Sequence, residues 1–418
     1  MEDLINKMLI DGNKITFQTD TIMNSILFED FWYEYENQPI SDVPSVILQI
    51  PFICNIAPVV WILGKKVQLE EMDHELFDSL KNIKSTLKTM FPRTNFDGEI
   101  CVKRKVTLSE YKRKNSIITL FSGGLDSIAT AFNHLNKDQT LLTVKGSDIQ
   151  LTDSFGWEKV KKSNIIFGET YKFKNSFVQS NFHDFLNQKK LSTISKEIPN
   201  WWAYIQHGLA LSSFMSIPAF INKSSNCYIA SSRSIYHPHK IWGSCPEIDN
   251  KIKWASSTVT HDNFHLSRQM KIKKIIEKTK SNNLPFPYLR VCYEEKGGKN
   301  CCSCEKCSRT IVGLFVEDQN PVNFGFNITE KSFLENLQKA FLHRKFKFTK
   351  STLYMWQEIQ KEILSVDSSS LLYWLKSYDF NAYQKKAERK YILRAKISFV
   401  LIKFPKLNKF VRRIVKLR

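Results

Sequence analysis

A glycine-rich hexapeptide between an apolar, β-branched run and a helical stretch constrains the fold of this chain more than any other feature. Residues 116–121 predict a buried strand, residues 127–135 a helix, and residues 140–144 a second strand. Short apolar runs that alternate with helices are typical of a parallel sheet covered on both faces. The hexapeptide consists of Ser122, Gly123, Gly124, Leu125, Asp126 and Ser127.

The alternation resumes after a long polar insertion. It predicts a helix over residues 201–215, a strand over 227–230 and a helix over 265–279, and after residue 324 helices over 332–342, 353–364 and 371–377. We expect an α/β protein with a parallel-sheet core over residues 113–325. An α+β region, 1–112, would precede this core, and a helical, basic region, 326–418, would follow it.

The glycine-rich loop has the chemistry of a phosphate site. Gly123 and Gly124 permit a tight turn that leaves backbone N–H groups free for a pyrophosphate, and Ser122 and Ser127 add hydroxyl groups. The positive end of the following helix favours an anion at the same place. The alternative is an ordinary Gly-Gly turn with a Ser or Asp helix cap.

Three more residues follow predicted strands and could reach the same ligand. Lys145 ends the second strand, and Ser232 and Arg233 follow the strand over 227–230. Since the carboxyl ends of parallel strands meet at one edge of the sheet, we expect these side chains near the nucleotide. For Arg233 the alternative is an exposed loop arginine.

The second strong signal is a cysteine cluster with the spacing C-x8-C-x2-C-x2-C. Four thiolates this close in sequence can surround one tetrahedral ion, and zinc suits such a set. An iron–sulfur cluster is the alternative, although the chain lacks the Cys and Pro that would continue a ferredoxin run. Cys302 lies outside the register and is expected to be a spectator, with replacement of Cys301 as the alternative. The expected ligands are Cys292, Cys301, Cys304 and Cys307.

The loop resembles the SGGxDS signature of the PP-loop ATP pyrophosphatase superfamily. The resemblance implies an adenine nucleotide alpha hydrolase-like fold and ATP with Mg²⁺ as cofactors. It also implies a reaction that cuts ATP between its α and β phosphates, adenylates a substrate oxygen and lets a nucleophile displace AMP. Asp126 would help to position Mg²⁺ and the other loop residues would cradle pyrophosphate.

Together, the loop and the cysteines resemble the 7-cyano-7-deazaguanine synthase family over residues 116–315, about half of the chain. That resemblance implies a structural zinc and the conversion of a deazaguanine carboxylate to an amide and then a nitrile, in queuosine-type biosynthesis. Arg268 stands where the family has a Lys, so Asp126, Ser127 and Arg268 are the expected catalytic residues. The added regions indicate a divergent relative of the sort found in biosynthetic or defence gene clusters, with partner proteins from such a cluster.

Residues 46–64 form the one apolar stretch of membrane length, but they contain Gln49, Pro51, Asn55 and Pro58. Two prolines and two amides argue against a membrane helix, and two strands over 46–52 and 58–63 are predicted instead. A helix is predicted over 76–90. Nine cysteines and an acidic start without a signal peptide indicate the cytoplasm.

Most of the positive charge belongs to the C-terminal end. Residues 381–418 carry 13 basic residues and one acid, or +12 of the total of +20, which leaves +8 for residues 1–380. RNA, an anionic membrane surface and the chain's own domain are the possible contacts of this tail. The alternatives to a ligase are accordingly a tRNA-modifying PP-loop enzyme that uses the tail as an RNA arm, and a non-catalytic nucleotide-binding assembly subunit.

Two weaker patterns remain. His261 and His265 are spaced to share a metal on a helix face, but Thr260 or Asp262 capping that helix is the favoured explanation. An aromatic stripe in the 201–215 helix could stack a heterocycle, although packing of a core helix is the default interpretation. The stripe comprises Trp201, Trp202, Tyr204, His207 and Leu209.

Overall fold

The computed structural model describes residues 2–19, 26–36, 38–108, 114–238, 241–292, 294, 298–363, 372–383 and 385. The chain divides into two compact units, Met1–Ile328 and Thr329–Arg418. The boundary predicted at residue 325 lies beside this division. Residues 1–112, in contrast, belong to the same unit as the core that follows them.

Five parallel strands form the centre of a nine-stranded sheet in the first unit. In spatial order they are β12 (Ser257–Asp262), β10 (Ser224–Ala230), β7 (Lys114–Leu120), β8 (Asp138–Lys145) and β9 (Lys174–Ser180). The α/β prediction is confirmed for these strands, and the sequence pattern had located three of them, β7, β8 and β10.

Antiparallel strands extend the sheet at both edges, so the whole sheet is mixed and not purely parallel. β11 (Lys253–Trp254) pairs with β12, and β4 (Phe31–Glu36), β3 (Lys14–Gln18) and β2 (Lys7–Asp11) continue the sheet beyond β9. The N-terminal strands therefore complete the sheet of the core, which is why residues 1–112 do not stand apart.

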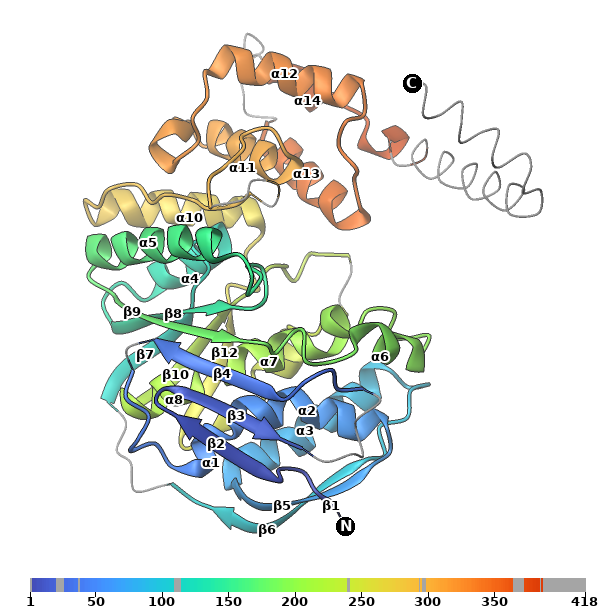
Figure 1. The fold of residues 1–418 in the computed structure, drawn as a ribbon. Helices are drawn as coiled ribbons and strands as arrows, with labels where there is room; N and C mark the ends of the chain where they lie inside the picture. The colour runs from blue at the N-terminus through green and yellow to red at the C-terminus, as the bar shows by residue number, and fades with distance from the viewer. Residues whose placement is uncertain are drawn as a thin grey trace, which may run out of the picture. The chain divides into compact units, whose positions relative to one another are not determined.

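Helices cover both faces of this sheet (Figure 1). On one side lie α4 (Leu125–Asn133), α5 (Ser154–Tyr171) and α10 (Arg268–Ser281), and on the other lie α7 (His207–Ser213) and α8 (Ser216–Ile221). The chain steps from β7 to β8 to β9 in one direction and then returns to β10, beside β7. Such a reversal opens a crevice at the carboxyl ends of the strands, where α/β sheets bind their ligands.

The predicted polar insertion after β8 is wrong. This stretch contains α5, β9 and the short helix α6 (Gln188–Ile194). α5 buries Trp157, Val160, Phe167 and Tyr171 at helical spacing. Its exposed face, however, also carries Phe155, Ile165 and Ile166, so the sequence lacks the polar face that would make this period visible.

The helix predicted over 265–279 begins later than expected. Ser267 caps α10 by accepting a hydrogen bond from the backbone N–H of Met270 at 3.2 Å. The predicted caps Thr260 and Asp262 are wrong because both residues lie in β12. A residue with cap chemistry is ambiguous when a short strand and a helix follow each other closely.

The two strands predicted over 46–52 and 58–63 are also wrong. These residues form the helices α1 (Ser45–Leu48) and α2 (Ile50–Ile62), and every residue of α2 is buried. A helix buried on all sides has no polar face, so its sequence reads as a continuous apolar run with neither helical nor strand period. In the part of the chain that the structure describes, no helix combines the length and apolar character needed to cross a membrane.

A small parallel sheet completes the N-terminal region. It consists of β1 (Glu2–Asp3), β5 (Lys66–Asp73) and β6 (Glu99–Val106). The helix predicted over 76–90 is confirmed as α3 (His74–Met90), and Asp73 caps it by accepting from the N–H of Leu76 at 2.9 Å. The first unit also contains α9 (Pro246–Asp249) and α11 (Glu305–Val316).

The second unit is helical, as predicted, within its described residues. Its helices are α12 (Glu330–Leu342), α13 (Lys350–Glu362) and α14 (Tyr373–Lys376). Phe341 lies at the centre of an aromatic core and contacts Trp356 and Trp374 with ring centroids 5.1 and 5.4 Å away. Apart from residues 381–383 and 385, the basic tail lies outside the described residues.

Candidate nucleotide site and cysteine centre

The glycine-rich loop joins β7 to α4, as predicted. Gly123 has φ +73°, and a Cβ there would lie 2.8 Å from Asn164 Oδ1, so both the backbone conformation and the space require glycine. The Ser127 hydroxyl donates to the Gly124 carbonyl at 3.0 Å and accepts from the Ser122 N–H at 3.3 Å. Ser127 therefore holds the loop closed.

The N-terminus of α4 carries no side-chain cap. Its N-cap residue is Gly124. The Ser or Asp cap of the alternative interpretation is therefore absent at this position. The first N–H groups of α4 keep their capacity for an anion, which is the arrangement that binds phosphates.

Asp126 lies in the first turn of α4 between two cations. One carboxylate oxygen is 3.2 Å from Arg268 Nη1 and the other is 3.0 Å from Lys271 Nζ. Burial disfavours the charged carboxylate, but Lys271 and Arg268 outweigh this effect and lower the pKa of Asp126 to about 2. Sequence reasoning singled out Arg268 but missed Lys271, which lies one helical turn further along α10.

A cavity of about 650 Å³ opens beside the loop, within the size range of small-molecule sites. The cationic side chains in its wall come from three segments, since Arg268 begins α10, Arg290 precedes the cysteines and Lys306 lies in α11. Ser122, Gly124, Leu125 and Asp126 line the same cavity. Asp126, Asp148 and Asp153 line the cavity as well, so three cations and three carboxylates surround the open helix N-terminus, a set that suits a polyphosphate together with its metal ion.

Arg290 connects the loop to the cysteine segment. Its backbone N–H donates to the Gly123 carbonyl at 2.9 Å, and its Nε donates to the Ser122 carbonyl at 3.0 Å. Burial lowers the pKa of this guanidinium while Asp148 opposes the shift, and an arginine in such a site stays charged. Sequence reasoning missed Arg290, although a cation two residues before Cys292 was an available signal.

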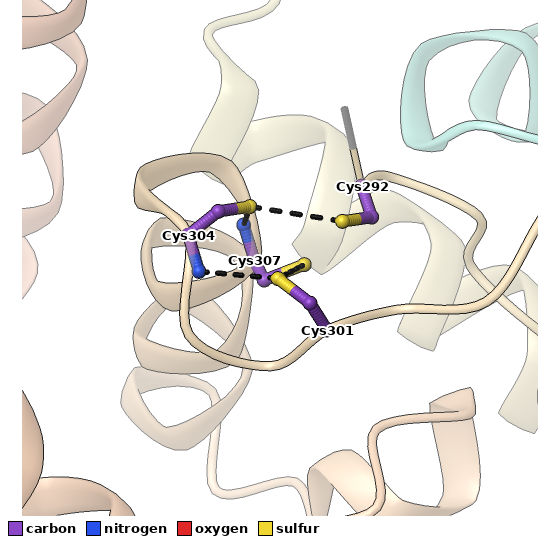
Figure 2. Close-up of side chains that lie close together, drawn as sticks. All are labelled: Cys292, Cys301, Cys304 and Cys307. Carbon is purple, nitrogen blue, oxygen red and sulfur yellow. Dashed lines mark hydrogen bonds between the residues drawn. The ribbon is translucent and has the colours of Figure 1, made fainter. Parts of the chain in front are cut away.

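The four predicted cysteines converge (Figure 2). Their Sγ atoms all lie within 4.8 Å of one another, with Cys292 and Cys304 at 3.9 Å and Cys301 and Cys307 at 4.0 Å. Ligands at 2.3 Å from a tetrahedral zinc ion would be about 3.8 Å apart, so the donor set fits such an ion. In the residues that the structure describes, no other group of His, Cys, Asp or Glu comes together in this way.

Backbone N–H groups stabilise the sulfur atoms. Cys304 N–H donates to Cys301 Sγ at 3.2 Å, and Cys307 N–H donates to Cys304 Sγ, which caps α11, at 3.5 Å. Hydrogen bonds from Cys307 outweigh burial and lower the pKa of Cys304 to about 5, and the same contact raises that of Cys307. Cys302 is outside the group and directs its sulfur to the Asn300 carbonyl at 3.6 Å, as expected for a spectator.

The remaining candidates lie away from the cavity wall. Lys145 is buried with its Nζ 5.9 Å from the ring centroid of Trp157, and Ser232 is exposed. The Arg233 guanidinium stacks 4.4 Å from the ring centroid of Trp242. Lys145 is the last residue of β8, and Ser232 and Arg233 follow β10, but the direction of a side chain at a strand end depends on the loop that follows.

His261 and His265 do not form a pair. His261 lies in β12 and its Nδ1 is 2.8 Å from Asp249 Oδ2, with both side chains buried.

Neither a protein-family model nor a curated protein sequence matches this chain. The functional argument therefore depends on the residues of these two centres and on the motif resemblance.

Proposed function

We propose that this chain is an ATP-dependent enzyme of the PP-loop type that adenylates a carboxylate or amide and then forms a C–N bond. The observation that supports this most directly is the set of cations Arg268, Arg290 and Lys306 around the uncapped N-terminus of α4. Three cations from separate segments are more than a structural glycine turn requires. Because carboxylates line the same wall, these cations suit a triphosphate that carries its own metal ion.

In the proposed reaction, an acceptor oxygen attacks the α-phosphorus of ATP and the α–β phosphoanhydride bond breaks. Pyrophosphate leaves with its new charge stabilised by Arg290, Lys306 and the N–H groups of α4. A nitrogen nucleophile such as ammonia then adds to the adenylated carbon and displaces AMP, with its proton passing to solvent. Dehydration of a resulting amide to a nitrile would repeat the adenylation on the amide oxygen.

Asp126 would take part through its free lone pairs. Each of its oxygens already accepts from one cation, but a carboxylate has about four acceptor sites and can also bind a metal ion. Mg²⁺ carried by the phosphates usually needs only one or two protein carboxylates, and Asp148 in the cavity wall offers the second. When bound, Mg²⁺ would offset phosphate charge.

The cysteine centre would have a structural role beside the cavity. Cys292 is two residues from Arg290, and Lys306 lies between Cys304 and Cys307 at the start of α11. Zinc, when bound, would supply four fixed bonds and no redox chemistry. Arg290 and Lys306 would then be held at the cavity by the residues that ligate the metal.

The test is a product assay with ATP, Mg²⁺ and ammonia and with 7-carboxy-7-deazaguanine as the first acceptor, followed by mass spectrometry. We expect AMP, pyrophosphate and the amide or nitrile. Release of ADP and phosphate in place of AMP and pyrophosphate would contradict adenylation. Asp126→Ala should abolish turnover. If the Asp126→Ala variant instead retained the full biological activity of the protein in cells, the alternative of a non-catalytic assembly subunit would be favoured.

A further inference from the structure

A row of partly exposed rings lies on the opposite face of the sheet from α4, α5 and α10. Trp202 contacts His183 and His207 with ring centroids 5.0 and 4.9 Å away, and His207 contacts Trp242 at 5.6 Å. The Arg233 guanidinium lies over the Trp242 ring, 4.4 Å from its centroid. We call these five residues the aromatic row. None of them lines the 650 Å³ cavity.

A π-helical turn creates the central contact of the aromatic row. Residues Trp202–Gln206 form this turn, and the His207 N–H donates to the Trp202 carbonyl five residues earlier. In a regular α-helix, residues five apart point about 140° away from each other. The π-turn brings the two rings onto one side, and such turns are frequent at functional sites.

Two glycines let a second segment close onto this turn. Gly243 N–H donates to the Ala203 carbonyl at 2.7 Å, and its own carbonyl accepts from the Gly208 N–H at 2.9 Å. A Cβ on Gly243 would lie 2.9 Å from Ile205 N, and one on Gly208 would lie 2.1 Å from Asp249 Oδ1. Trp242 is thereby fixed beside His207 by contacts that admit no side chain.

The aromatic row has unused hydrogen-bonding capacity. His207 Nδ1 and Trp242 Nε1 are shielded from solvent and have no hydrogen-bond partner, although both rings are partly exposed. Burial lowers the pKa of His207, so its ring is neutral and offers one donor and one acceptor. Other buried polar atoms, such as Trp201 Nε1 and Trp254 Nε1, also lack a partner, but those of His207 and Trp242 are distinguished by lying side by side in partly exposed rings. A missing ligand is one recognised cause of such atoms.

The aromatic row and the nucleotide cavity share the same edge of the sheet. His183 follows β9 and Arg233 follows β10. Of the two strands between them, β7 leads into the glycine-rich loop and β8 ends near Asp148. Asp148 interacts electrostatically with both His207 and Arg290. A molecule bound to the aromatic row can therefore extend a substituent over this edge toward the glycine-rich loop.

We propose that the aromatic row binds the acceptor substrate, a planar nitrogen heterocycle of the nucleobase class with a carbonyl or ring-nitrogen acceptor. The rings supply stacking. When the Trp242 and His207 rings turn toward the ligand, Trp242 Nε1 donates a hydrogen bond to the acceptor atom and His207 pairs with a ring nitrogen or N–H. This inference rests on the proposed function for the identity of the reaction. The binding step can be tested without it.

The experiment measures binding of hypoxanthine and of 7-carboxy-7-deazaguanine to the full-length protein by calorimetry, with benzoate as a ring that lacks nitrogen. α,β-Methylene-ATP is titrated separately. We expect Trp242→Leu and His207→Leu each to weaken heterocycle binding at least about tenfold, the size of a lost stacking and hydrogen-bonding contact. Binding of the ATP analogue should stay within about twofold. Trp32→Phe, on β4, is the matched control and should change neither affinity.

Trp242→Phe separates stacking from hydrogen bonding, since it keeps a ring and loses the N–H donor, and it should have an intermediate affinity. Circular dichroism and thermal unfolding establish that each variant is folded. Unchanged heterocycle affinity in the folded Leu variants would overturn the proposal, as would failure of both heterocycles to bind the wild-type protein. Equal loss of the ATP analogue would assign the aromatic row to adenine. If heterocycles bind as expected and the ATP analogue does not, the proposed reaction fails and the heterocycle site remains.

Discussion

The glycine-rich loop and the aromatic row lie at the same edge of one sheet, but they are built in different ways. The loop is a local motif, in which six consecutive residues and one helix end supply the geometry. The aromatic row is assembled from residues 183, 202–207, 233 and 242, which come together through a π-turn and two glycines. The local motif could be recognised in the sequence, whereas of the aromatic row only Trp202 and His207 stood out, as part of the aromatic stripe.

Loss of the cysteine centre should have the largest effect and should separate the two sites. We expect Cys304→Ser to reduce zinc affinity by more than about 100-fold, beyond the loss typical of outer-shell residues. Arg290 and Lys306 would then lose their support, so binding of α,β-methylene-ATP should fall while heterocycle binding persists. Metal analysis and calorimetry measure both effects.

Cys302→Ser is the matched control, because Cys302 is adjacent in sequence but outside the group of four. It should keep metal and nucleotide binding. Equal loss in Cys302→Ser and Cys304→Ser would show that the observed ligand set is incorrect.

Arg290→Gln should have the next largest effect, confined to the nucleotide side. Removal of one preorganised donor to a developing oxyanion typically costs about 10²–10³ in rate. We expect a loss of this size in AMP formation with heterocycle binding unchanged. Arg93→Gln, at an exposed arginine, serves as the control and should retain full turnover. A loss below tenfold in Arg290→Gln would argue against contact with the phosphates.

Acid should weaken the protein through Asp126. The pKa of this carboxyl is lowered from 3.8 to about 2, so its ion pairs stabilise the folded state above the unfolded value of 3.8. That stability is lost as the pH falls through about 2, and the shift corresponds to about 2 kcal/mol. Urea unfolding from about pH 5 to about pH 2 should show this dependence in the wild-type protein and lose it in Asp126→Asn. An identical pH slope in the two proteins would refute the ion-pair assignment.

A pair of glycine substitutions gives the smallest and most selective test. Gly123→Ala strains the glycine-rich loop, and Gly243→Ala displaces Trp242 from the π-turn. Each should cost about 1 kcal/mol in the free energy of unfolding, as overpacking does. Gly123→Ala should weaken binding of α,β-methylene-ATP only, and Gly243→Ala should weaken heterocycle binding only. Crossed effects would mean that the two sites are one.

Several elements of the fold follow from sequence patterns, and the failures have physical causes. β7, β8 and β10 were predictable because apolar, β-branched runs lie between clear helices. α2 was not, because burial on all sides removes the polar face that reveals a helix. β9 and β12 were missed because both strands are mostly polar, with Phe177 and Val178 the apolar residues of β9 and Val259 that of β12.

The sequence by itself determined the two local centres, the glycine-rich loop and the four-cysteine spacing, because consecutive residues and short gaps limit the geometry that a backbone can adopt. Only the tertiary structure decided that Lys271 pairs with Asp126, that Arg290 reaches the loop and that Trp242 lies on His207. These contacts join segments between 35 and 168 residues apart. Such contacts depend on how strands are ordered and helices are packed, which no local pattern in the chain encodes.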